Sequence, residues 1–250
     1  MKRTKPKSDG TLLPEARAPK VDDNRRTFGV DEAGRGPIIG PMAIAVVALD
    51  KRGAAALRRA GVADSKSFGF GADACAKRAE LADKVRARAI AWGMRLVDVE
   101  EIDLYTRRGQ LNALERRVAC EILRELACAA DERIVCDGAL LFSPLRVLFP
   151  SLRAVDNGES AHVSVAAASI VAKDARDKAF AQIAARYEPD FGPITGGGYI
   201  NAATRRFLDA YRARHNDLPP EARKSWGAPK LEDTLPLFDP AKPAPTEQLD

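Results

Sequence analysis

Residues 27–49 have the sequence TFGVDEAGRGPIIGPMAIAVVAL. The stretch begins with a short apolar run that ends in two acids, Asp31 and Glu32, and it closes with an almost wholly apolar run at 41–49. An uninterrupted apolar run rich in β-branched residues predicts a strand that is buried on both faces. The glycines and prolines between the two runs predict a tight connection. The stretch therefore predicts two strands of one sheet, with acids at the end of the first.

The rest of the chain predicts further strands and helices in alternation. Alternating or short apolar runs predict strands at 92–96, 133–137 and 152–156. Apolar residues spaced three or four apart, or runs rich in alanine and charged residues, predict helices at 72–91, 111–126, 166–187 and 201–215. Such alternation predicts an α/β fold in which helices cover a sheet.

Length and composition set the broad class of the protein. The 250 residues are 46% hydrophobic, which suffices for one domain with a sizeable core. A net charge of +5 suits a polyanionic partner but also describes many unrelated proteins. No apolar run approaches the roughly 20 residues that span a bilayer, and the basic N-terminus lacks the apolar stretch of a secretory signal. We therefore expect a cytoplasmic protein.

The cysteines and histidines argue against a zinc site. The four cysteines, at positions 75, 120, 128 and 136, form no C-x-x-C pair, and the chain has two histidines, His162 and His215. We expect the cysteines to be buried thiols in a reducing compartment and neither histidine to be catalytic.

Acidic residues at predicted strand ends suggest metal chemistry. Asp31 and Glu32 follow one apolar strand, and Asp137 ends another. Clustered carboxylates repel one another unless a cation neutralises them, and their hard oxygens are the ligands that Mg²⁺ and Mn²⁺ prefer. Two such ions flanking a scissile phosphate would stabilise its hydrolysis. The competing interpretation is that these acids simply face solvent.

Several motifs extend this pattern in a fixed order. They are VDEAGRGP at 30–37 followed by GP at 40–41, DSK at 64–66, DG at 137–138, AASIVAKDARD at 167–177, GY at 198–199 and SWG at 225–227. In this order they closely resemble the signature elements of ribonuclease HII, the type 2 ribonuclease H family. The resemblance spans about residues 27–230.

This resemblance implies a fold and an activity. The fold would be α/β and ribonuclease H-like, a five-stranded mixed sheet flanked by helices, with the catalytic domain at 26–190 and a small helical C-terminal extension at 191–230. The activity would be endonucleolytic hydrolysis on the 5′ side of ribonucleotides, in RNA/DNA hybrids and at single ribonucleotides embedded in duplex DNA. Two Mn²⁺ or Mg²⁺ ions would assist, and the ends would be 5′-phosphate and 3′-hydroxyl.

The resemblance also implies the metal-binding acids. Asp31, Glu32 and Asp137 match the catalytic carboxylates of the family. The family's fourth acid is an aspartate upstream of the AASI helix, and counting back from that helix without gaps places Glu159 there. Asp156, at the end of a predicted strand, remains an alternative.

Substrate contacts are implied by the remaining motifs. Gly34, Arg35 and Gly36 match the loop that recognises the ribose 2′-hydroxyl, where glycines let the backbone approach a sugar closely. Tyr199 matches a tyrosine that stacks on the sugar beside the ribonucleotide, and Lys66 matches a phosphate contact. The alternatives are a plain tight turn, a core aromatic residue and a surface lysine. Lys173 and Arg176 could face nucleic acid or be solvated. The lysine that usually precedes the family's Gly-Tyr is replaced by glycine in the run 196–198, which predicts a more mobile loop.

The two ends of the chain differ in composition from the part between them. Residues 1–25 predict a disordered basic arm, and residues 231–250 predict a disordered, acidic and proline-rich tail. Within the tail, TLPLF at 234–238 loosely resembles peptides that dock on the bacterial sliding clamp, although a chance match is the competing interpretation. A metal-dependent DNA exonuclease of the same superfold and a non-catalytic nucleic-acid-binding protein are the alternative functions.

Overall fold

The computed structural model describes residues 25–62 and 71–226. Within them, five strands form one sheet in the order β3-β2-β1-β4-β5. The strands are β1 (Thr27–Ala33), β2 (Met42–Leu49), β3 (Ala91–Val97), β4 (Arg133–Asp137) and β5 (Leu152–Val155). β2 runs antiparallel to β1 and β3, whereas β4 runs parallel to β1 and β5. The predicted five-stranded mixed sheet is confirmed.

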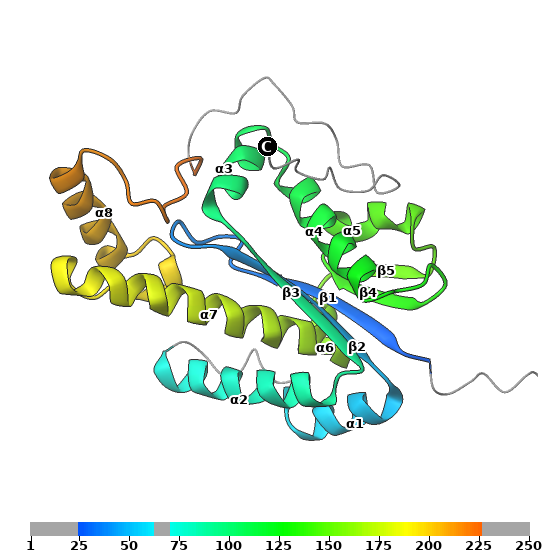
Figure 1. Ribbon diagram of the computed structural model, residues 1–250. Helices are drawn as coiled ribbons and strands as arrows, with labels where there is room; N and C mark the ends of the chain where they lie inside the picture. Colours follow the sequence, from blue (N-terminus) through cyan, green and yellow to red (C-terminus); the bar gives the residue numbers. More distant parts are fainter. Residues whose placement is uncertain (1–24, 63–70, 227–250) are drawn as a thin grey trace, which may run out of the picture.

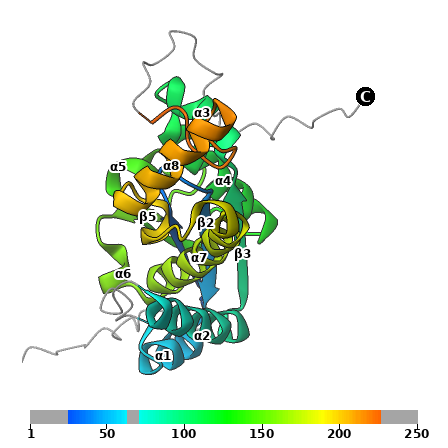
Figure 2. The same ribbon diagram turned by 90° about the vertical axis from the view of Figure 1, so that its left-hand side faces the viewer.

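Helices cover both faces of the sheet, as Figures 1 and 2 show. One face carries α3 (Val99–Arg107), α4 (Leu111–Glu125) and α5 (Ala139–Phe142), the last continued by a 3-10 helix at Ser143–Val147. The other face is crossed by α7 (Val163–Phe191), which follows the short α6 (Gly158–Ala161). α1 (Lys51–Arg59) and α2 (Ala72–Arg88) pack on the outer side of α7. Each face of the sheet thereby buries its own apolar cluster.

The burial of the strands follows their places in the sheet. All eight residues of the inner strand β2 are buried, as its apolar run predicts. The edge strand β3 forms where predicted, but its burial does not alternate, and Trp92 and Leu96 remain 39% and 43% exposed. The prediction of a half-buried strand is wrong for these two side chains because an edge strand has a neighbour on one side only.

Small residues let α7 lie directly against β1. The backbone of Ser164 passes so close to Gly29 that a Cβ on this glycine would lie 2.0 Å from the Ser164 carbonyl carbon. The first turns of α7 continue with alanines and with Ser169, all of them fully buried. This close crossing brings the polar side chains of α7 beneath the acids of β1.

Four of the described α-helices were not predicted from the sequence, and two of them, α5 and α6, are only four residues long. α1 and α3 are nine residues each, too short for a clear periodicity. Both begin at an aspartate that accepts a hydrogen bond from a backbone N–H three residues later, Asp50 from Gly53 (2.6 Å) and Asp98 from Glu101 (2.8 Å).

The C-terminal part is helical, as predicted. α8 (Ala202–His215) packs on the end of α7, and together they form a third apolar cluster that includes Ile183, Phe207 and Leu208. Figure 2 looks at the end of the molecule where α8 lies. Because α7 contributes to this cluster and runs to Phe191, the two regions share a core, and the boundary between residues 190 and 191 stays a prediction.

The cysteines are free, but the expectation that all four are buried is wrong. Cys120 and Cys136 are buried, whereas Cys75 and Cys128 are partly exposed at a helix surface and in a turn. None of the described helices is long and apolar enough to cross a membrane. The DSK motif, the predicted tail and all of the predicted arm except Arg25 lie outside the described residues.

Candidate active site

Two neighbouring parallel strands bring the predicted acids together. Asp31 and Glu32 lie inside β1 rather than after it, since β1 continues to Ala33, and Asp137 is the last residue of β4. The register pairs Val30 with Cys136, so the next residue of each strand, Asp31 and Asp137, also lies side by side. The expected proximity of these acids is confirmed, although the prediction that Asp31 and Glu32 follow the strand is wrong.

Asp31 of β1 is buried and Glu32 is partly buried, and this burial raises the pKa of both carboxyls. Asp31 is 5% exposed. Burial first, and then the charges of Glu32 and Asp137, raise the pKa of Asp31 to about 7, against a hydrogen bond with Ser169 and the charge of Lys173. Burial and then the charge of Glu115 raise the pKa of Glu32 to about 7 as well. Negative charge at this site is therefore costly without a counter-charge.

Glu159 joins this group through α7. It lies on α6, is 7% exposed, and its Oε2 accepts a hydrogen bond from Ser169 Oγ (3.0 Å). The same oxygen lies 3.3 Å from Lys173 Nζ. Ser169 and Lys173 are also the groups that lower the pKa of Asp31. Glu159 and Asp31 therefore share two polar neighbours.

The alternative acid, Asp156, has a different role. It is exposed, and its Oδ1 accepts a hydrogen bond from the N–H of Ala139, the first residue of α5 (2.8 Å). Asp137 instead accepts from the N–H of Gly158, at 2.8 Å, next to Glu159. Asp156 thus stabilises the start of α5, whereas Glu159 lies on the side of Asp137.

The donor set fits divalent cations by its chemistry. Glu32 Oε2 is buried, and no hydrogen-bond partner for it lies among the described residues. In residues 25–62 and 71–226, no three acid, histidine or cysteine side chains are already gathered at the spacing of a finished metal site. The acids are nevertheless close enough to raise one another's pKa, and hard carboxylate oxygens favour Mg²⁺ or Mn²⁺. A cation would supply the missing counter-charge and bring these oxygens closer.

The β1–β2 loop, residues 34–41, follows these acids directly. Gly34 has a φ of +86°, which favours glycine. The side chain of Arg35 points to α4, where it pairs with Glu115 (3.2 Å) and donates to Asn112. Glu115 is fully buried, and burial raises its pKa to about 7. The sequence contained one sign of this contact, because Glu115 interrupts the apolar positions of a predicted amphipathic helix.

Tyr199 lies over the β1–β2 loop from the other side. It follows the 3-10 helix at Gly196–Gly198 and is 53% exposed, so it is not a core aromatic residue. A Cβ added to Gly36 would lie 3.0 Å from Tyr199 Cε1, which places the ring against this glycine. The N–H groups of Ile38 and Ile39 donate to the carbonyl of Gly198, at 2.9 and 3.2 Å. The two loops predicted to contact substrate therefore form one continuous surface.

Two further positions, Arg176 and Lys66, were considered as nucleic-acid contacts from the sequence. Arg176 neither faces solvent nor offers its charge to a ligand, because it is 5% exposed and donates to backbone carbonyls. Lys66 lies outside the described residues. A second buried arginine, Arg223, is 1% exposed and was not singled out from the sequence, since an arginine beside a motif gives no sign of burial.

Known proteins with this sequence pattern and fold point to one family. A family model described as Ribonuclease HII matches residues 28–228. A ribonuclease HII of Thermococcus sibiricus is 33% identical over 216 residues, which cover 83% of this chain and 91% of that protein. The ribonuclease H2 structure of Pyrococcus horikoshii OT3 matches with a TM-score of 0.68 at 29% identity, covering 80% of this chain and 93% of that one. The ribonuclease HII of Archaeoglobus fulgidus, solved in complex with PCNA, matches with a TM-score of 0.66 at 27% identity, covering 84% and 97%.

Proposed function

The chain belongs to the ribonuclease HII family and is therefore a ribonuclease H endonuclease, and we propose that it cuts on the 5′ side of ribonucleotides. The substrates would be RNA/DNA hybrids and duplex DNA that carries a single embedded ribonucleotide, and the ends 5′-phosphate and 3′-hydroxyl. The observation that carries this proposal is the contact of Tyr199 with Gly36, immediately beyond the acids of β1. Family membership favours this endonuclease over the DNA exonuclease and the non-catalytic protein.

The proposed metal ligands are Asp31, Glu32, Asp137 and Glu159. When bound, two Mn²⁺ or Mg²⁺ ions would supply positive charge at the scissile phosphate and lower the cost of its attack by water. Three of these carboxylates, those of Asp31, Glu32 and Asp137, would hold that charge on the sheet. Lys173, which lies 3.3 Å from Glu159, keeps a further positive charge beside them.

We choose Glu159 over Asp156 as the fourth acid. Glu159 is buried and shares Ser169 and Lys173 with Asp31. Asp156 is exposed, and its carboxylate already accepts a hydrogen bond at the start of α5. A glutamate extends its carboxylate one methylene further than an aspartate, which suits its place on the separate helix α6.

The β1–β2 loop would recognise the ribose through its backbone. The 2′-hydroxyl both donates and accepts hydrogen bonds, and it distinguishes RNA from DNA at a given nucleotide. Gly34 and Gly36 leave the backbone accessible to a sugar, whereas Arg35 is held against α4 by Glu115. We therefore assign recognition to main-chain groups of residues 34–36 and an anchoring role to the Arg35 side chain. The exposed ring of Tyr199 would stack on the neighbouring sugar.

Two further contacts fall outside the described residues. Lys66 would contact a substrate phosphate as a point charge. Residues 234–238 would contact a sliding clamp, which is supported by the complex of the Archaeoglobus fulgidus relative with PCNA.

The decisive experiment uses two duplexes of the same sequence, one with a single ribonucleotide and one of DNA alone. We expect incision on the 5′ side of the ribonucleotide, dependent on Mg²⁺ or Mn²⁺, and an intact all-DNA duplex. Asp31→Asn should lose most activity, because a neutral amide is a poor ligand for these ions. Activity that persists in excess EDTA would contradict the metal mechanism, and equal cutting of both duplexes would contradict recognition of the 2′-hydroxyl.

A further inference from the structure

Two buried arginines lie beneath the β1–β2 loop and have no part in the chemistry proposed above. Arg176 comes from α7 and is 5% exposed, and Arg223 comes from the C-terminal segment, residues 221–226, and is 1% exposed. Buried guanidinium groups are costly unless their donors are satisfied. The carbonyl groups that accept from their nitrogens therefore show what these arginines hold in place, although Arg176 Nε is buried with no partner among the described residues.

Arg223 donates to three carbonyl groups of the β1–β2 loop. Its Nη2 lies 2.6 Å from the carbonyl oxygen of Gly34 and 2.9 Å from that of Gly40, and its Nη1 lies 3.0 Å from that of Arg35. Its Nε donates to Gly40 as well, at 3.1 Å. One planar guanidinium thus connects the start and the end of the loop from below.

The C-terminal segment places this arginine by several backbone contacts. Ala222 forms an antiparallel bridge with Ile39, Gly40 N–H donates to the Glu221 carbonyl, and Arg223 N–H donates to the Ile38 carbonyl, the last two at 2.8 Å. Trp226 adds a hydrogen bond from Nε1 to the Gly36 carbonyl, at 3.2 Å. The segment therefore supports the loop along most of its length.

Asp103 on α3 anchors the segment in turn. It is buried and accepts hydrogen bonds from the N–H groups of Lys224 (2.8 Å) and Ser225 (3.1 Å) and from the Ser225 hydroxyl. Burial, followed by the nearby charge of Arg176, lowers the pKa of Arg223 to about 10, so the guanidinium stays charged at neutral pH.

Arg176 connects the β1–β2 loop to the Tyr199 loop, residues 195–199. Its Nη2 lies 2.7 Å from the Ile39 carbonyl and 2.8 Å from the Gly197 carbonyl. A Cβ on Gly34 would lie 2.8 Å from Arg176 Nε, so the loop rests directly on this side chain. The glycine run, expected to be more mobile for lack of a lysine, is fixed here through its carbonyls.

We propose that Arg223 and Arg176 are positioning residues that hold the β1–β2 loop and Tyr199 as one preformed surface and thereby set the preference for a ribonucleotide over a deoxyribonucleotide. The inference rests on the proposed function, since it assigns recognition to residues 34–36. Recognition by main-chain groups needs carbonyl and N–H directions fixed before binding, because a flexible loop would accept either sugar.

The test measures binding in an Asp31→Asn background, so that no duplex is cut, with Mg²⁺ present. Dissociation constants are determined for the single-ribonucleotide duplex and the all-DNA duplex of the same sequence, and their ratio is the selectivity. A loss of folded protein lowers the amplitude of both titrations without changing this ratio. A merely structural role of the arginines would therefore leave the selectivity unmoved.

We expect Arg223→Lys to lower the selectivity by about 5- to 20-fold, because a lysine ammonium cannot reach three carbonyls in the fixed fork of a guanidinium. Arg176→Lys should act in the same direction. Trp226→Phe removes a single donor to the loop and should lower the selectivity by about 2- to 5-fold, which keeps the test open if an arginine variant does not fold.

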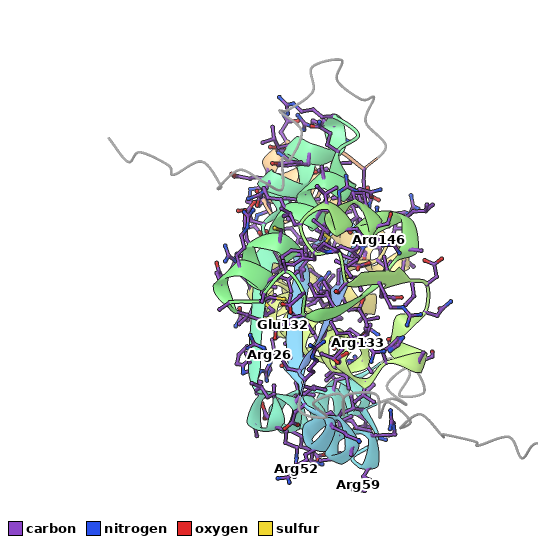
Figure 3. All side chains as sticks on the ribbon, turned by 90° about the vertical axis from the view of Figure 1, so that its right-hand side faces the viewer. Arg26, Arg52, Arg59, Glu132, Arg133 and Arg146 are labelled. Atoms are coloured by element: carbon purple, nitrogen blue, oxygen red, sulfur yellow. The ribbon has the colours of Figure 1, made fainter. Side chains whose placement is uncertain are left out.

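The matched control is Arg26→Lys. Arg26 pairs with Glu132 and donates to the Ala127 carbonyl at the opposite end of β1, the end that Figure 3 faces. The selectivity of the Arg26→Lys variant should stay within about twofold of that of the Asp31→Asn background protein. If the background protein binds both duplexes equally, the proposed function fails. If it prefers the ribonucleotide and the Arg223, Arg176 and Trp226 variants keep that preference, this inference alone is overturned.

Discussion

The hydroxyl of Ser169 donates to Oε2 of Glu159 at 3.0 Å, and the same hydroxyl lowers the pKa of Asp31. Because the serine belongs to α7 and the acids to α6 and β1, a single fully buried side chain connects three elements at the candidate metal site. This relationship distinguishes Glu159 from the other acids near the end of β5.

Glu159→Gln should lower turnover on the single-ribonucleotide duplex at least tenfold, because one of four ligand carboxylates is lost. Mn²⁺ should recover part of the activity, since it tolerates imperfect carboxylate geometry better than Mg²⁺. Asp156→Asn is the matched control and should stay within a few-fold of the wild type. If the two outcomes were exchanged, Asp156 would be the ligand and Glu159 a structural acid.

Tyr199→Ala should reduce cleavage at single ribonucleotides and DNA–RNA junctions more than cleavage of a long hybrid. Stacking of an exposed aromatic ring contributes about 1–3 kcal/mol, or about 5- to 150-fold. Ile200→Ala is a suitable control, because Ile200 is the next residue and is 52% exposed. Steady-state kcat/KM on the three substrates checks this, and an equal loss on all of them would show that the tyrosine is structural.

Gly36→Ala should impair the same substrates by displacing the tyrosine ring. The new Cβ would lie 3.0 Å from Tyr199 Cε1, closer than ordinary van der Waals contact. Gly36 is exposed, so we expect little change in the melting temperature. Combined with Tyr199→Ala, the Gly36 substitution should have a much smaller additional effect, and full additivity of the two losses would argue against contact between these residues.

The metal-free protein should lose stability as the pH rises, because the pKa values of Asp31 and Glu32 are raised in the folded state. The folded-state pKa values of Asp31 and Glu32 are raised to about 7, from ordinary values of 3.8 and 4.5. A raised folded-state pKa favours folding below the unfolded pKa, and this contribution is lost as the pH rises through about 7. The titration of Asp31 and Glu32 should therefore lower the free energy of unfolding as the pH rises from about 4 to about 7.

Asp31→Asn removes one of these charges and should raise the melting temperature of the EDTA-treated protein at pH 8 by about 2–6 °C. This gain in melting temperature should shrink at pH 4, where the carboxyl of Asp31 is neutral in the folded wild type. At pH 8, Mg²⁺ should stabilise the wild type more than the variant. Thermal melts at the two pH values check this. A variant that is less stable than the wild type at pH 8 would contradict the effect.

Deleting residues 231–250 should reduce retention by an immobilised sliding clamp while leaving cleavage of the single-ribonucleotide duplex unchanged. The apolar residues of TLPLF at 234–238 are the proposed anchor. Unchanged retention after the deletion would show that the match to clamp-docking peptides arose by chance.

The sequence predicted the sheet and its acids because their signals are local. The apolar run of β2 and the acids at the ends of apolar runs need no knowledge of distant contacts, and motif order assigned the family. Strand order also placed Asp31 beside Asp137 once the two strands were taken as neighbours. Counting back from the helix at 167–177 placed Glu159 at the fourth acid, and the end of a predicted strand kept Asp156 as the alternative. The hydrogen bonds of the two side chains favour Glu159.

The supporting residues could not be predicted because their roles depend on contacts between distant segments. Arg176 lies in a helix rich in charged residues, where a solvated arginine is the ordinary outcome, and Arg223 lies beside a short motif with no periodicity. Their burial follows from backbone carbonyls that every residue carries and that leave no mark in the sequence. The helices α1 and α3 could not be predicted either, because nothing in the sequence distinguishes their capping aspartates from other acids.

The contact between Arg223 and Gly34 joins residues 189 positions apart, which makes it one of the last that a growing or folding chain can form. All four proposed metal ligands precede residue 160, so they emerge from the ribosome well before the segment that supports the loop. If Arg223 sets the preference for a ribonucleotide, the proposed ligands are synthesised before the residue that makes the enzyme selective. An incomplete chain that ends before residue 221 would carry the proposed metal ligands without the segment that supports the β1–β2 loop.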